Sequence, residues 1–157
     1  MLKNIALYNF RDTTKIIDYF VNQKIEFKEL NKLEDTDKFD LVITHNCIDM
    51  LKNEMINVHP SLLPAYPSKD AIIKAFSDGV KVSGITIHTK EKIIAQYPII
   101  IGLETHIDDF INEIQEIENK LLPIVIDTII NNRVFDFKDI FSNGCNRGGC
   151  SNCKGCN

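Results

Sequence analysis

The sequence lacks the features that mark membrane, secreted and nucleic-acid-binding proteins. No apolar run approaches the roughly 20 residues of a membrane span. The N-terminal residues lack the long apolar core of a signal peptide. Lysine and arginine form no cluster in the body of the chain and the net charge is −4, which argues against a large nucleic-acid footprint, because phosphate binding needs clustered cations. We therefore expect a cytoplasmic protein with small-molecule ligands and without membrane or nucleic-acid partners.

The hydrophobic periodicity of the first half predicts an α/β domain. The 157 residues suit one domain, and no internal repeat is visible. Strand-like runs occupy residues 4–9, 24–30 and 40–44, and residues 11–22 carry apolar side chains at helical spacing. Strands that alternate with helices in this way form a sheet with crossover connections.

The second half continues with helices and strands. Thr105 and Asp108 resemble a capping box, which predicts the start of a long helix with an apolar face. Gly79 suits the C-terminal cap of a shorter helix. The elements expected here are a helix at 69–78, strands at 82–89 and 93–101, the long helix from 106 onward, and a short final strand at 133–137.

The most informative stretch is residues 55–67, where an apolar run ends in a proline-rich turn. Asn57 and His59 lie two residues apart, so in a strand both side chains leave the same face. The prolines fix the backbone that follows, and rigid elements position polar groups well. The pair therefore predicts a catalytic site, and the alternative is a strand end whose histidine caps a backbone group.

Residues 57–67 closely resemble the signature of the folate-dependent formyltransferases, above all the phosphoribosylglycinamide formyltransferases. Further matches follow in the family's order: residues 84–88 are similar to its G-x-T-x-H strand, residues 93–96 to the next strand, and residues 118–123 to its E-x-x-x-x-P helix. The resemblance implies a three-layer, Rossmann-like fold with a mostly parallel sheet and helices on both faces. It also implies transfer of a formyl group from formyl-tetrahydrofolate to an amine, as in purine biosynthesis.

The resemblance assigns roles to three residues of this chain. Asn57 would donate to the formyl oxygen as negative charge builds on it, and His59 would help to hold that oxygen and shuttle protons. His88 would support the pair from a neighbouring strand. The family's aspartate, which takes the proton of the amine, is missing because its loop is cut to a tight hairpin. Glu91 is the only acid in this hairpin, either as a substitute base or as a solvated turn residue.

Two further regions bear on what the chain binds. Ile48, Met50 and Leu51 would wall the folate pocket, which is largely apolar in the family. The turn at residues 8–14 contains no glycine, so backbone N–H groups cannot easily approach an anion there. A phosphoribosyl acceptor is therefore disfavoured.

Four of the five cysteines crowd the last thirteen residues, with C-x4-C-x2-C-x2-C spacing. They are Cys145, Cys150, Cys153 and Cys156. This polar segment cannot fold on a core of its own, and in a reducing compartment its spacing favours a metal over disulfides, an iron–sulfur cluster before zinc. We therefore divide the chain into a domain at 1–141 and a metal-binding tail at 142–157, for which a redox protein is a suitable partner. Cys47 is an extra ligand, a reactive thiol or inert packing.

Three functions remain open from the sequence. The first is formyl transfer at a site that has lost its acid. The second is a non-catalytic or repurposed iron–sulfur (or zinc) protein on the same scaffold, which the tail and the missing acid favour. The third is hydrolysis of formyl-folate, since water can replace the amine. The acceptor and the oligomeric state do not follow from the sequence.

Overall fold

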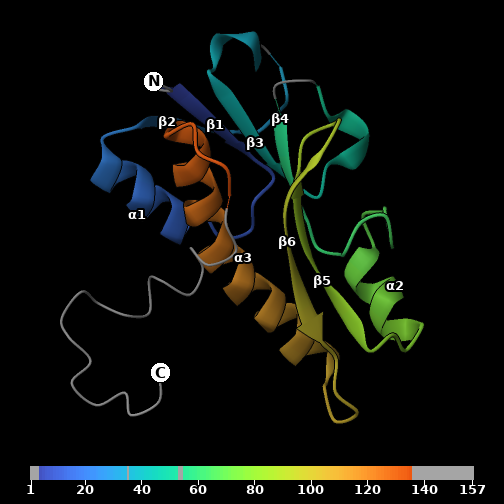
Figure 1. Ribbon diagram of the computed structural model, residues 1–157. Coiled ribbons are helices and arrows are strands. Elements are labelled where there is room, and N and C mark those ends of the chain that lie inside the picture. The colour runs from blue at the N-terminus through green and yellow to red at the C-terminus, as the bar shows by residue number, and fades with distance from the viewer. Residues whose placement is uncertain (1–3, 35, 53–54, 136–157) are drawn as a thin grey trace, which may run out of the picture.

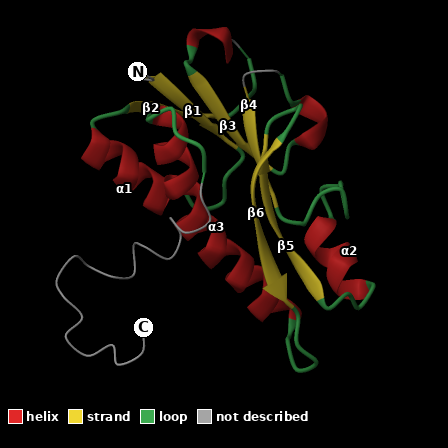
Figure 2. Cartoon of the chain, in the orientation of Figure 1, coloured by secondary structure: helices red, strands yellow, loops and turns green. Residues whose placement is uncertain are grey.

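The computed structural model describes residues 4–34, 36–52 and 55–135, which form a six-stranded sheet and three α-helices (Figures 1 and 2). The strands are β1 (Asn4–Tyr8), β2 (Glu26–Leu30), β3 (Leu41–His45), β4 (Met55–His59), β5 (Val82–His88) and β6 (Ile93–Ile100), and the helices are α1 (Thr14–Gln23), α2 (Ala71–Ser77) and α3 (Ile107–Ile130). The 3₁₀ turns η1 (Thr36–Lys38) and η2 (Ile48–Met50) precede β3 and β4. The proposed tail at 142–157 and the last residues of the proposed domain, 136–141, lie outside the described residues.

The strand pairing in the sheet changes from parallel to antiparallel after β4. Its strand order is β2-β1-β3-β4-β5-β6, and the pairings from β2 to β4 are parallel. The pairings of β4 with β5 and of β5 with β6 are antiparallel. The sheet is therefore mixed: three of its five pairings are parallel, in line with the expectation of a mostly parallel sheet, and two are antiparallel. The short turn between β5 and β6 accounts for the antiparallel pairing of these two strands, because a connection of a few residues joins only antiparallel neighbours.

The two faces of the sheet are covered differently. On one face, Ile43 and Val58 join the main core beneath the helices. On the other face, Val42 and Met55 form a smaller cluster that Phe39 closes. In the described part of the chain the α-helices contribute to the first cluster alone, so the expectation of helices on both faces is wrong there. The connections from β2 to β3 and from β3 to β4 hold only a 3₁₀ turn each.

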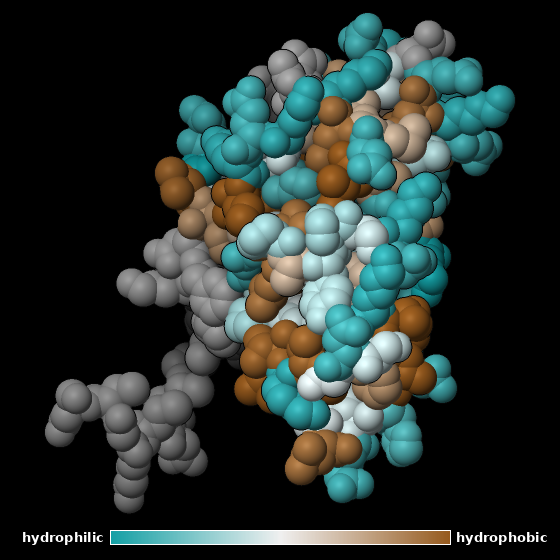
Figure 3. All heavy atoms as spheres, turned by 90° about the vertical axis from the view of Figure 1, so that its right-hand side faces the viewer, coloured by the Kyte–Doolittle hydropathy of each residue, from teal (hydrophilic) through white to brown (hydrophobic). Residues whose placement is uncertain are grey.

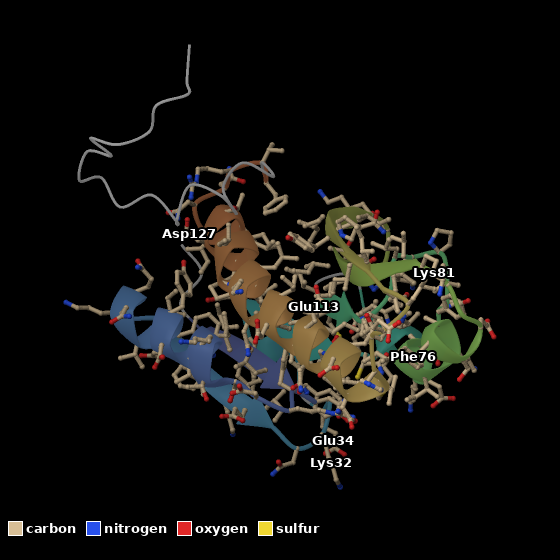
Figure 4. The ribbon with its side chains drawn as sticks, turned by 90° about the horizontal axis from the view of Figure 1, so that it is seen from below. Lys32, Glu34, Phe76, Lys81, Glu113 and Asp127 are labelled. Carbon is tan, nitrogen blue, oxygen red and sulfur yellow. The ribbon has the colours of Figure 1, made fainter. Side chains whose placement is uncertain are left out.

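Helix α3 is the centre of the helical layer, with α1 beside one half and α2 beside the other (Figure 4). Phe76 of α2 stacks on Phe110 of α3, with ring centroids 6.2 Å apart. Toward the C-terminal end of α3, the Tyr19 hydroxyl of α1 donates to the Asp127 carboxylate at 2.9 Å. These contacts join the three helices to one another.

The start of α3 and the segment that follows the helix differ from the sequence prediction. The Thr105 hydroxyl accepts a hydrogen bond from the Gly102 N–H at 3.0 Å, so the predicted capping box does not form and His106 is the N-cap. Pro123 lies inside the helix, whose buried face outweighs the roughly 3 kcal/mol that an internal proline costs. Residues 133–135 form no strand, which corrects the described part of the prediction for 133–137.

On the face shown in Figure 3, the described residues form no extended apolar band. On the face that carries α2 and the β5–β6 hairpin, apolar side chains lie in separate patches among polar ones (Figure 3). Scattered exposed apolar side chains are normal and need no partner. None of the helices in the described ranges is long and apolar enough to cross a membrane.

Candidate active site

The two polar side chains of the signature lie at the C-terminal end of β4, in the middle of the sheet. Asn57 and His59 are both 0% exposed. Two residues apart on one strand, they point to the same face as Met55. Asn57 pairs in register with Thr44 of β3 and with His88 of β5. The register of the sheet therefore surrounds the Asn57 amide with polar groups.

Three hydrogen bonds fix the Asn57 amide. Its Oδ1 accepts from the Thr44 hydroxyl and from the Cys47 N–H, each at 3.0 Å. Its Nδ2 lies 3.0 Å from Nε2 of His88, whose Nδ1 lies 2.8 Å from the Thr89 carbonyl oxygen. Because that carbonyl can only accept, the His88 proton is on Nδ1 and Nε2 accepts from Asn57. One N–H of Asn57 has no partner among the described residues and can donate to a substrate oxygen.

The His59 ring has one nitrogen engaged and one free. Nε2 donates to the Tyr66 carbonyl oxygen at 2.9 Å, so the backbone-capping role considered for this histidine is present. Nδ1 is buried and has no hydrogen-bond partner in the described part of the chain. Burial lowers the pKa of His59 below its usual value of 6.5. The ring is therefore neutral near pH 7, with a lone pair on Nδ1 that can take a proton.

Thr86 and Gln96 fix the proline-rich turn that follows the pair. The Thr86 hydroxyl donates to the Ser61 carbonyl oxygen at 2.7 Å and accepts from the Leu63 N–H at 3.0 Å. Gln96 Nε2 donates to the Leu63 carbonyl oxygen and to the Thr86 hydroxyl, each at 3.0 Å. At Gly84 a Cβ would lie 2.1 Å from the backbone of β6. The residues that match the G-x-T-x-H strand thus hold the turn and, through His88, the Asn57 amide.

The three apolar residues expected at the folate pocket do not share one cavity. Ile48 and Met50 line a small cavity of about 50 Å³, and Met50 is 49% exposed. Leu51 instead packs against the cluster around Met55 and lines a hollow of about 410 Å³. That hollow is lined by Thr36, Asp37, Phe39, Val42, Leu51, Lys52, Met55 and Lys90.

Glu91 lies in the exposed turn between β5 and β6. Its backbone N–H donates to the Thr89 hydroxyl at 3.3 Å. No hydrogen bond or ion pair within the described ranges joins its carboxylate to Asn57 or His59. The structure therefore does not bring Glu91 to the pair, and its position is that of a solvated turn residue.

A cleft of about 370 Å³ opens where β1 and β3 end and where Pro60 follows β4. Ligands of open α/β sheets usually bind at the carboxyl ends of the parallel strands. The lining residues come from the end of β3, from the three loops that follow β1, β3 and β4, and from the helices α2 and α3: Asn9, Phe10, Arg11, Asp12, His45, Asn46, Pro60, Lys69, Asp70, Ile72, Ile73, Ile111, Ile114, Gln115, Glu118 and Asn119. The cleft thus begins one residue after His59.

His45 and Glu118 meet on the wall of this cleft. His45 Nε2 lies 3.0 Å from Glu118 Oε1, and the side chains are 15% and 13% exposed. The Phe10 ring lies against His45, with ring centroids 5.4 Å apart. Sequence reasoning missed this pair because 73 residues separate its members. The only available signals were that His45 directly follows an apolar run and that Glu118 begins the E-x-x-x-x-P match.

Cys47 is a free and buried cysteine. Its thiol donates to the His45 carbonyl oxygen at 3.1 Å, and its sulfur accepts from the Asn9 amide at 3.6 Å. Burial raises the pKa of the Cys47 thiol, which favours packing over reactivity. Among the residues that the structure describes, no group of three or more His, Cys, Asp or Glu side chains could hold a metal ion. The four tail cysteines lie outside the described residues.

Known proteins resemble this chain in sequence and in fold. Residues 36–126 match the Formyl transferase family model. The chain is 42% identical to phosphoribosylglycinamide formyltransferase of Bacillus subtilis over 88 aligned residues. The alignment covers 51% of this chain and 45% of that relative. The chain is 27% identical to formyltetrahydrofolate deformylase of Haemophilus influenzae over 108 aligned residues. This alignment covers 65% of this chain and 39% of that relative.

The crystal structure of phosphoribosylglycinamide formyltransferase from Bacillus halodurans superposes with a TM-score of 0.65 at 22% identity, over 85% of this chain and 100% of that chain. At this identity the likeness concerns the fold. The chain spans less than half the length of the two relatives matched by sequence. The family model covers more than half of the chain, from η1 through most of α3. The chain belongs to the formyl transferase family.

Proposed function

We propose that this chain transfers a formyl group from formyl-tetrahydrofolate to an amine, with Asn57 and His59 at the reacting atoms. The observation that carries the proposal is a pair of unsatisfied groups at the end of β4: one N–H of the Asn57 amide and the lone pair on His59 Nδ1. Membership of the formyl transferase family supports the reaction class. The Haemophilus influenzae relative is named a formyltetrahydrofolate deformylase, which supports formyl-tetrahydrofolate as the cosubstrate.

The two groups divide the chemistry. The amine nitrogen attacks the formyl carbon, and negative charge develops on the formyl oxygen, to which the Asn57 N–H donates. The bonds from Thr44 and Cys47 hold that N–H in place before the reaction, so no reorganisation is needed. The attacking amine passes a proton to His59 Nδ1. His59 returns it to the folate nitrogen as the bond from that nitrogen to the formyl carbon breaks.

This assignment gives His59 the proton transfer that an aspartate would otherwise perform. The lowered pKa of His59 keeps its ring neutral, so that Nδ1 is ready to accept a proton near pH 7. Glu91 then has no step to perform, which fits its exposed position in the turn. His88 acts only through the hydrogen bond that orients Asn57.

The hollow of about 410 Å³ is the candidate folate site. Its volume lies in the range of about 300–1,000 Å³ that holds small-molecule ligands. Leu51 and Met55 supply an apolar floor for an aromatic ring, and Lys52 and Lys90 supply ammonium groups for the carboxylates of a folate. Met55 precedes Asn57 by two residues on the same face, about 7 Å along the strand. Ile48 and Met50, in their separate small cavity, have no part in this hollow.

The experiment uses the full chain with formyl-tetrahydrofolate labelled with carbon-13 in the formyl group. Carbon-13 NMR follows the label with and without a panel of primary amines. A new formamide signal that needs both protein and amine supports transfer. Formate without amine supports hydrolysis instead, the reaction for which the Haemophilus influenzae relative is named. A label that stays on the folate in every mixture refutes both.

A matched pair of variants tests the folate site. Lys52→Ala and Lys90→Ala remove the two ammonium groups of the hollow, and we expect each to weaken folate binding about tenfold in calorimetry. Lys81→Ala removes an exposed ammonium group before β5 and should leave binding unchanged. Equal effects of all three variants would contradict the location of the site.

The cysteine tail is a separate proposal that rests on its spacing alone. Cys145, Cys150, Cys153 and Cys156 would bind an iron–sulfur cluster or zinc. No comparison supports the alternative of a repurposed iron–sulfur protein, so the tail stands as an addition to a formyltransferase domain. Purification without oxygen, followed by iron, zinc and sulfide analysis, tests it. Colourless protein without either metal would refute it.

A further inference from the structure

We infer that the cleft at the ends of β1 and β3 takes an amine with an aliphatic body and without a phosphate group. The reason is that the Asp12 carboxylate occupies the place at the start of α1 where a phosphate would bind. This inference rests on the proposed formyl transfer, because it concerns the acceptor of that reaction. It goes further, because it names the chemical class of the acceptor and the residue that sets it.

The start of α1 is already bound to an anion from its own chain. Asp12 Oδ1 accepts from the Thr14 N–H at 2.9 Å. This backbone hydrogen bond holds the pKa of Asp12 below its usual value, so the carboxylate is charged at neutral pH. Free N–H groups at a helix N-terminus bind phosphate. Here the Thr14 N–H of the first turn already donates to Asp12, and the negative charge of the Asp12 carboxylate would repel a phosphate at this position.

The loop that carries Asp12 is tied to its surroundings. Asn119 of α3 also lines the cleft, and its Nδ2 donates to Asp12 Oδ2 at 3.5 Å. Asn9, at the start of the loop, donates to the His45 carbonyl oxygen at 2.8 Å. The loop contains no glycine that would let its backbone approach a ligand closely. A rearrangement that exposes the Thr14 N–H to a phosphate would break these contacts.

The remaining lining suits an aliphatic amine. Ile72, Ile111 and Ile114 supply an apolar wall. Three carboxylates line the cleft against two cations, His45 aside, so the balance does not favour a phosphate dianion. Glu118 uses Oε1 for His45, and its Oε2 has no partner in the described part of the chain. An amine with an aliphatic body can therefore place its nitrogen near Glu118 and its body on the isoleucines.

Two probes and two variants test the inference on the full chain by NMR titration. The probes are ribose 5-phosphate and 3-methylbutylamine, and the reporters are the Thr14 amide and the methyl groups of Ile111 and Ile114. In the wild type we expect the amine to shift the methyl signals and ribose 5-phosphate to leave the Thr14 amide unchanged. Asp12→Ala frees the Thr14 N–H and removes the charge, so ribose 5-phosphate should bind about tenfold more tightly than to the wild type.

Asp70→Asn is the matched control, because it removes a carboxylate from the same cleft without touching Thr14. It should not gain phosphate binding. Ribose 5-phosphate binding at Thr14 in the wild type, as tightly as in Asp12→Ala, would overturn the inference, and so would an amine that leaves the isoleucine methyl groups unshifted. Neither titration needs folate. A failure of formyl transfer with the expected titrations would therefore refute the proposed function and not the preference of the cleft.

Discussion

Removal of the Thr44 hydroxyl should slow formyl transfer while leaving folate binding intact. Thr44 is completely buried, and its hydroxyl donates to Asn57 Oδ1 at 3.0 Å. Thr44→Val keeps the shape of the side chain and removes this bond. Asn57 Oδ1 then keeps only the Cys47 N–H as a donor. A hydrogen bond of this kind contributes about 1 kcal/mol, so the productive orientation of the amide should lose about a fivefold preference.

The assay measures the rate at saturating formyl-folate together with its dissociation constant by calorimetry. We expect Thr44→Val to lower kcat about fivefold without a change in the dissociation constant. Thr128→Val is the matched control, because the Thr128 hydroxyl is also buried and donates to the Ile124 carbonyl oxygen at 2.8 Å, inside α3. Both variants should lose about 1 kcal/mol of unfolding free energy, but only Thr44→Val should lose rate. Equal rates in the two variants would refute the role of Thr44 in orienting the amide.

Three further predictions follow from the site. Burial lowers the pKa of His59 from 6.5, so the rate in a pH–rate profile should be constant near neutral pH and fall only below pH 6.5. The unfolding free energy should also fall below pH 6.5, because the unfolded chain binds more protons at His59 and His88 than the folded chain does. Glu91→Gln should leave kcat within about twofold of the wild type, and a loss of about a hundredfold would make Glu91 the base. Gly84→Ala should cost about 3 kcal/mol in urea unfolding because its Cβ would meet the backbone of β6 at 2.1 Å. Gly79→Ala, with φ of 68° and open space around it, should cost only about 1 kcal/mol.

Local patterns predicted the elements that depend on local chemistry. The run before Asn57 is a strand, and the two-residue spacing does place Asn57 and His59 on one face. The resemblance to the formyltransferases is confirmed by the family model. The capping box failed because a competing partner, the Gly102 N–H, engages the Thr105 hydroxyl.

The contacts between residues far apart in the sequence could not be predicted, because only the folded chain brings these residues together. The partners of the Asn57 amide come from β3, from the loop after β3 and from β5, and only the register of the folded sheet brings them together. The pairing of His45 with Glu118 needs α3 to cross the ends of the parallel strands. Similarly, the sequence showed that the first turn lacks glycine, but only the structure shows Asp12 bound to the Thr14 N–H.

The most direct test of the central claim is the transfer rate of Asn57→Asp. Aspartate keeps an oxygen for Thr44 and Cys47 but has no N–H to donate to the formyl oxygen. Loss of one such donor typically costs a factor of about a hundred to a thousand in kcat. We predict a loss of this size, with retained folate binding and an unchanged circular dichroism spectrum. A folded Asn57→Asp variant that transfers formyl within about tenfold of the wild-type rate would contradict the account.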